Sequence, residues 1–82
     1  MSQNKSKRDE AVKLLEDFDE VTLVFSNDDE CTIGNADNYL GGGDGYISEY
    51  LGNILYMTAE GAVDATIESM KSNGAELVDW RE

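Results

Sequence analysis

The chain has 82 residues, of which 18 are acidic, six are basic and none is histidine, so its formal charge at pH 7 is −12. A chain this short forms one domain and buries only about 60–65% of the surface that its unfolded form exposes. The lack of histidine excludes Ser-His and Cys-His catalytic pairs and imidazole-bound zinc. We therefore expect neither an enzyme nor a protein that carries a cofactor.

The cysteine content and the hydropathy pattern indicate in which cellular compartment the protein is expected. Cys31 is the only cysteine and cannot form an internal disulfide, which favours a reducing environment. No run approaches the ~20 apolar residues of a membrane span, and no apolar leader follows the polar N-terminal residues. We expect a soluble, cytoplasmic protein.

The first predicted element is a helix. Apolar residues at positions 11, 14, 15 and 18 recur at the spacing of one helical face. With Ser6 as a capping residue, this pattern predicts a helix at about 6–18 that follows a flexible N-terminal segment at 1–5.

A β-hairpin is predicted next. Apolar residues alternate along 21–25 and again along 31–33, and a polar stretch rich in carboxylates separates the two runs. We expect strands at about 20–26 and 30–34. Cys31 lies in the second strand, away from any cation that would lower its pKa, and is expected to be a structural thiol.

A glycine-rich segment follows the hairpin. Four of the eight glycines lie within 41–45, where a phosphate-binding loop is one hypothesis. The spacing does not match G-x-G-x-x-G, because Tyr46 occupies the last required position, and no lysine or arginine lies within twenty residues. A calcium loop is also disfavoured, since Leu40 stands where an EF-hand needs glycine. We interpret the segment as a connection, or as a loop that becomes ordered on binding, whose Asp44 caps the next helix.

Apolar residues of the second half predict two helices and a strand. Positions 47, 50, 51, 54 and 55 keep helical spacing, which favours a helix at about 46–57 with Tyr50 in the core. Gly52 opposes this helix, and "NILYMT" at 53–58 is an alternative strand. Thr58 is a plausible cap for a third helix that ends at Asn73-Gly74, and "AELVDW" is typical of a final strand.

These elements give the order α-β-β-α-α-β. We expect a single α+β domain over 6–82, with a small, mostly antiparallel sheet packed against the helices.

The charge is distributed unevenly along the chain. All six basic residues lie near its two ends, and the 57 residues between Lys13 and Lys71 carry thirteen carboxylates and no cation. Ordinary domains mix both signs, because opposite charges pair and limit self-repulsion. A charge of −12 repels nucleic acid and anionic membranes, so a basic protein surface is the expected partner.

Candidate partner-binding residues come from three segments. On the third predicted helix, carboxylates recur every four residues and form a row with ~6 Å steps, similar to the spacing of phosphates along a nucleic-acid strand. We expect this row to be an uncompensated local cost. The hairpin tip and the glycine-rich segment add further acids and two tyrosines, and the acidic cluster at 16–20 extends the surface if the fold brings it to the same face. The candidates are Glu60, Asp64, Glu68, Asp28, Asp29, Glu30, Asp44, Tyr39 and Tyr46.

In size, acidity and lack of catalytic residues, the chain resembles small phage-encoded counter-defence proteins, such as anti-CRISPR proteins and other DNA mimics. The resemblance is carried by the cation-free segment 14–70. It implies a non-enzymatic inhibitor that docks on a basic nucleic-acid-binding protein or nuclease complex, with carboxylates in place of phosphates and aromatic residues as apolar anchors.

Three other interpretations remain open. In the first, the chain is an acidic structural domain, monomeric or homodimeric, in which a dimer compensates for the small core. In the second, it is a cation-binding regulator. In the third, its acidity serves solubility or reflects a halophilic source.

Overall fold

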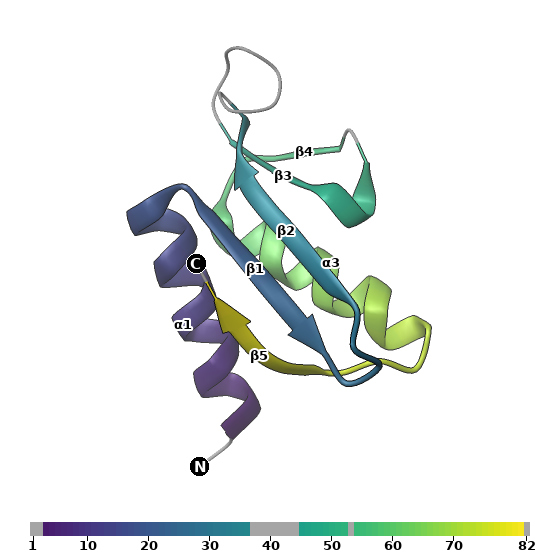
Figure 1. Cartoon of the computed structure of the whole chain (residues 1–82). Helices are drawn as coiled ribbons and strands as arrows, with labels where there is room; N and C mark the ends of the chain where they lie inside the picture. Colours follow the sequence, from purple (N-terminus) through teal and green to yellow (C-terminus); the bar gives the residue numbers. More distant parts are fainter. Residues whose placement is uncertain (1–2, 37–44, 53, 82) are drawn as a thin grey trace.

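The described part of the chain, residues 3–36, 45–52 and 54–81 of a computed structural model, folds around the predicted β-hairpin (Figure 1). The hairpin consists of β1 (Glu20–Phe25) and β2 (Glu30–Asn35), with Val21 opposite Ile33 and Leu23 opposite Cys31. Its turn uses Asp28 at a φ of 70°, and the backbone N–H of Asp28 donates to the carbonyl of Phe25 at 2.9 Å. The predicted hairpin is therefore confirmed.

Three more strands complete an antiparallel sheet in the order β4-β3-β2-β1-β5. The strand β3 (Tyr46–Ser48) pairs with β2, and β4 (Leu55–Tyr56) pairs with β3. The final strand that the sequence predicts is β5 (Leu77–Arg81), and it pairs with β1 on the other side. The two borders of the sheet are thus β4 and β5.

The helices α1 and α3 lie on one face of this sheet, where they contact each other (Figure 1). The helix α1 (Gln3–Phe18) begins three residues before the predicted start, so Ser6 lies within it and is not its cap. The helix α3 (Ala59–Ser72) begins as predicted, because the Thr58 hydroxyl accepts a hydrogen bond from the backbone N–H of Gly61 at 3.0 Å. It ends at Asn73 and Gly74, and the φ of 84° at Gly74 favours glycine there.

The predicted helix at 46–57 is wrong. The segment forms β3, a 3-10 turn η1 (Glu49–Leu51) and β4. Pairing with β2 and β4 holds β3 extended, and Gly52 ends η1 at a φ of 80°. Tyr50 is exposed and not in the core; its hydroxyl oxygen accepts a hydrogen bond from the Asn73 side chain at 2.6 Å.

The core lies between the sheet and the helix pair. Alternate residues of β1 and β2 point toward the helices, and residues from both helices and β5 meet them. The fully buried large side chains of this layer are Leu15, Val21, Leu23, Phe25, Ile33, Val63 and Met70. The domain is therefore α+β, as predicted, with two helices where three were expected among the described residues.

A buried polar pair ties β3 to α3. Ser48 and Thr66 are both fully buried, and their hydroxyl oxygens lie 2.8 Å apart. The Thr66 hydroxyl also lies 2.9 Å from the carbonyl oxygen of Ala62. Because Thr66 has one hydroxyl hydrogen, it donates to Ala62 while Ser48 donates to Thr66, so both buried hydroxyls are satisfied.

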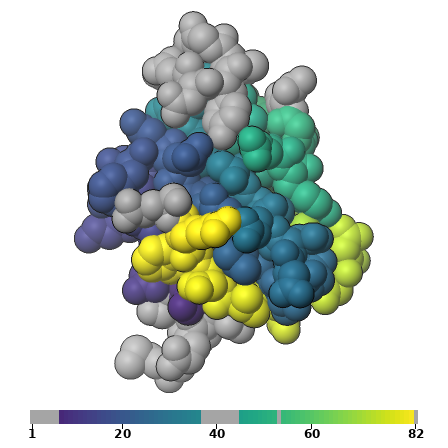
Figure 2. All heavy atoms as spheres, in the orientation of Figure 1, coloured from purple at the N-terminus to yellow at the C-terminus, as the bar shows by residue number. Residues whose placement is uncertain are grey.

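The opposite face of the sheet carries no helix within the described ranges, and Figure 2 looks onto it. The hydroxyls of Thr22 and Thr32 lie 3.1 Å apart on this face. Arg81 of β5 and Glu30 of β2 form an ion pair across β1. In the described parts of the chain, neither helix has the length and apolar character needed to cross a membrane.

Candidate functional site

The acidic row on α3 is not free, because Arg8 of α1 binds two of its three members. The Arg8 Nε and Nη2 atoms donate to the two Asp64 carboxylate oxygens at 2.9 and 2.8 Å, and Nη2 also donates to Glu60 at 3.0 Å. Nη1 donates to Asp9 at 2.9 Å. The expectation that the row is uncompensated is therefore wrong for Glu60 and Asp64, since a cation more than fifty residues away in sequence binds both and offsets part of their charge.

This arrangement fixes the charge state of Arg8. Its side chain is only 26% exposed. Hydrogen bonds to Asp64, then to Asp9, raise the pKa of Arg8 above its usual range, and burial opposes this shift. Arg8 therefore stays charged and acts as a cationic connection between the two helices.

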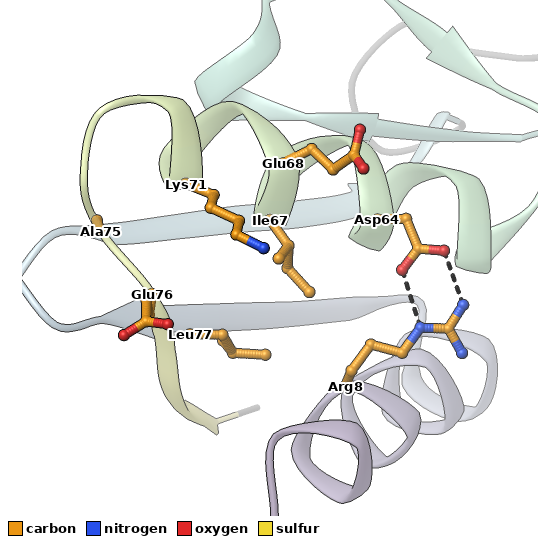
Figure 3. A pocket seen from close by; sticks show the side chains of 8 residues that line it. All are labelled: Arg8, Asp64, Ile67, Glu68, Lys71, Ala75, Glu76 and Leu77. Carbon is orange, nitrogen blue, oxygen red and sulfur yellow. Dashed lines mark hydrogen bonds and ion pairs between the residues drawn. The ribbon is translucent and has the colours of Figure 1, made fainter. Parts of the chain in front are cut away.

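A groove lies beside this connection (Figure 3). It has a volume of about 390 Å³ and runs between α1, α3 and the start of β5. The groove is lined by Arg8, Asp64, Ile67, Glu68, Lys71, Ala75, Glu76 and Leu77. Arg8 already makes four hydrogen bonds to carboxylates, and the walls carry three acids and two cations, so the groove does not strongly concentrate charge of either sign.

A second acidic cluster lies where α1 ends and β1 begins. We call it the α1-end cluster: Glu16, Asp17, Asp19 and Glu20, all exposed. Within the described ranges, no ion pair reaches Glu16, Asp17 or Asp19, and Lys13, one turn earlier, makes none with them. The charge of this cluster extends to β3, because burial and then the nearby charges of Glu16 and Asp19 raise the pKa of Tyr46.

The α1-end cluster opposes the local preferences of the helix. The C-terminus of a helix carries partial negative charge, so a carboxylate there costs about 0.3–1 kcal/mol, and α1 has no basic residue in its last turn. Asp19 follows the helix at a φ of 65°, a position that favours glycine. By contrast, α3 has Glu60 in its first turn and Lys71 in its last, as the helix dipole prefers.

Phe18 lies within this cluster and faces outward. Its helical spacing places it with the apolar face of α1, but it is 59% exposed. A large apolar side chain among carboxylates is a feature that sequence periodicity alone did not identify. The signal in the sequence was the acidic stretch at 16–20, which has neither glycine nor a cation at the predicted end of the helix.

The hairpin tip is acidic but internally bonded. Asn27 donates its side-chain N–H to Asp29 at 2.9 Å and accepts a hydrogen bond from the Asp29 backbone N–H at 3.1 Å. Glu30 is paired with Arg81. Asp28 is exposed in the turn.

The remaining candidates divide into three cases. Asp44 and Tyr39 lie outside the described residues, as do Leu40 and the other glycines of the 41–45 segment. Tyr46 is half-buried and packs against the core opposite Tyr56, so it is not a projecting anchor. Glu68 is exposed on α3 and lines the groove with Lys71.

Gly45 is the one glycine of the 41–45 segment that the structure describes, and its surroundings explain why this position holds glycine. Its φ is 120°, and a Cβ placed there would lie 2.5 Å from the carbonyl oxygen of Tyr56. Glycine is required here by the close approach of β4 and by the backbone conformation, and not by a phosphate ligand.

Cys31 is a buried core thiol, as the sequence predicts. Burial, followed by the charges of Asp29 and Glu49, raises the pKa of Cys31 to about 11. The thiol is therefore protonated at neutral pH and is not an activated nucleophile. Among the described side chains, no group of three cysteine or carboxylate residues is arranged to hold a metal ion.

Comparison of this chain with protein-family models, with curated proteins and with solved structures finds no match.

Proposed function

We propose that this chain is a non-enzymatic, acidic binding module that docks on the basic surface of a nucleic-acid-binding protein, as an inhibitor of the DNA-mimic or anti-CRISPR type. The partner's cationic groups bind carboxylates of this chain in place of phosphates. The α1-end cluster is the principal contact, and the acidic hairpin tip is a second source of charge.

The observation that carries this proposal is the conflict between the α1-end cluster and the stability of its own helix. Acids at a helix C-terminus, with an aspartate in a left-handed conformation, each cost folding free energy. The other helix of the same domain follows the dipole preference at both ends. Local rules are commonly broken at functional sites, and this is the place in the described helices where they are broken most clearly.

The surroundings of the cluster fit a protein partner. Phe18 offers an exposed aromatic ring among the carboxylates, and aromatic side chains often dominate interface energetics when they insert into a partner pocket. Charge complementarity around such a ring accelerates and orients binding. An exposed phenylalanine flanked in sequence by exposed acids thus suits a basic surface that contains an apolar pocket.

Affinity capture with matched baits tests the proposal. The wild-type chain, a Glu16→Lys/Asp17→Lys variant and a Glu49→Lys/Glu76→Lys variant are immobilised and exposed to nuclease-treated lysate of the host organism. Both variants change the net charge by the same amount, but only the first changes the α1-end cluster.

We expect the wild-type and Glu49/Glu76 baits to retain the same basic nucleic-acid-binding protein at low salt and to release it at high salt. The Glu16/Asp17 bait should not retain it. Equal retention by all three baits, or retention that is indifferent to salt, contradicts the proposal.

A further inference from the structure

A group of exposed apolar side chains lies at the β4 border of the sheet, away from the α1-end cluster in sequence. We call it the β4 patch: Tyr50, Ile54, Leu55 and Met57. These are four of the six large apolar residues that are exposed in the described parts of the chain, and Met57 is 71% exposed. The four residues lie within eight positions, on η1 and on or beside β4. Exposed apolar residues that gather in this way are typical of an interaction surface.

The patch lies on and beside β4, a border strand that carries no charged side chain. The strand β4 is the last in the sheet order and pairs only with β3 (Figure 1). The opposite border, β5, carries Asp79 and Arg81, which form ion pairs with Lys7 and Glu30. Charged side chains at a border strand discourage pairing with another strand, so β5 is protected in a way that β4 is not.

The charge of the chain indicates which occupant fits this patch. Residues 50–59 form the longest run in the sequence without aspartate, glutamate, lysine or arginine. A basic partner finds no counter-charge there. At a contact made through this run, neither copy contributes a charge from the run itself, so a second copy of this chain is repelled less there than at a segment that carries carboxylates.

The charged residues on either side of the run 50–59 also fit a second copy of this chain as the occupant. Glu49 and Glu60 are the nearest charges on its two sides in sequence, and Glu60 is already bonded to Arg8. One of the two flanking charges is thus compensated within the same chain.

We propose that the β4 patch is a self-association surface, at which a second copy of this chain pairs through β4 about a two-fold axis. Antiparallel pairing of the two β4 strands joins the two sheets, and the exposed side chains of the patch cover one another. The surface used differs from the α1-end cluster, so each chain of the dimer keeps its acidic surface for a partner.

Sedimentation equilibrium over a range of about 1 μM to 1 mM tests this proposal. We expect the wild-type chain to pass from monomer to dimer with concentration. The variant Leu55→Arg should weaken the dimer about 30-fold or more, because it places a charge in the contact. Val78→Arg makes the same change at an exposed valine of β5 and should leave the dimer intact.

Two further measurements keep the test decisive. Met57→Arg alters the most exposed member of the patch and decides the outcome if circular dichroism shows that Leu55→Arg is unfolded. Salt should strengthen the dimer, since it screens repulsion between two chains of charge −12, whereas it should weaken binding to a basic protein. The self-association proposal and the docking proposal therefore predict opposite effects of salt, and each can be contradicted without the other.

A wild-type chain that is monomeric throughout this range overturns the proposal. So does a dimer that Val78→Arg disrupts while Leu55→Arg and Met57→Arg do not.

Discussion

Asp19 shows at a single residue how the α1-end cluster departs from what stability favours. It adopts a left-handed conformation directly after α1, and its backbone N–H donates to the Leu15 carbonyl at 2.9 Å. The conformation suits glycine, and the position suits a neutral or positive side chain. An aspartate meets neither preference.

The variant Asp19→Gly should therefore raise the free energy of unfolding by about 1 kcal/mol. Asp28→Gly is the matched control, because Asp28 has a similar φ of 70° but lies in the hairpin turn and not at a helix end. Urea denaturation of both variants should show the larger gain in stability for Asp19→Gly. This substitution removes both a side chain that disfavours the left-handed conformation and a negative charge at the C-terminus of the helix. A loss of stability on Asp19→Gly would contradict this explanation.

Cys31 gives a pH dependence at the residue scale. The ordinary thiol pKa is 9.0, and in the folded state it is raised to about 11. The raised value stabilises the fold fully below pH 9, and this contribution is lost as pH rises through 11, because the unfolded thiol ionises first. The difference corresponds to about 2–3 kcal/mol.

Thermal or urea unfolding of the wild type and of Cys31→Ala from pH 8 to pH 11 measures this effect. We expect the stability of the wild type to fall by about 2–3 kcal/mol more than that of the variant over this interval. Parallel pH profiles for the two proteins would show that Cys31 does not contribute.

At the scale of elements, the two helices are held together by both apolar packing and Arg8. The cation binds Asp9 on its own helix and Glu60 and Asp64 on α3. Without it, Glu60 and Asp64 repel each other at the i,i+4 spacing. Reversing the charge of these two acids thus removes a helix connection as well as surface charge.

Arg8→Met should lower the free energy of unfolding by about 1–2 kcal/mol, because it keeps most of the apolar stem and removes the hydrogen bonds. Lys13→Met is the control on the same helix, since Lys13 is exposed and makes no ion pair with another described residue, and its effect should be within about 0.5 kcal/mol. Equal effects in urea denaturation would show that the connection does not stabilise the helix pair.

The elements also show what sequence periodicity resolves. The hairpin, α3 and β5 follow from alternation, from the Thr58 cap and from Gly74, all of which are local signals. The segment 46–57 has the spacing of a helix but forms β3, η1 and β4, because its pairing with β2 is a contact between segments far apart in sequence. Short apolar runs of this kind are compatible with either structure until their neighbours are known.

The candidate site was predicted less completely than the fold, for the same reason. The sequence shows the excess of acids, and it places the three members of the α3 row correctly on one helix. It does not show that Arg8 crosses from α1 to bind two of them, nor that Phe18 points away from the core. Those facts depend on how the two helices pack, which no local pattern encodes.

At the scale of the whole molecule, the terminal cations are used to connect the fold. Lys7, Arg8 and Arg81 each bind a carboxylate of another element, so they compensate α3, β2 and β5. Among the described residues they leave the α1-end cluster without an ion pair to Glu16, Asp17 or Asp19. The pairing of these cations thus determines where unpaired acidic charge remains on the surface. The α1-end cluster, which we propose as the docking surface, and the uncharged β4 patch then lie on different elements of one small domain.

The most direct test of the docking proposal is a competition between this chain and duplex DNA for the captured basic protein. Fluorescence anisotropy of labelled DNA is measured while the wild-type chain is added, at several salt concentrations. We predict that the chain displaces the DNA completely and that its affinity falls steadily as salt rises. A ternary complex that holds both the chain and the DNA, or an affinity that does not change with salt, would contradict the account.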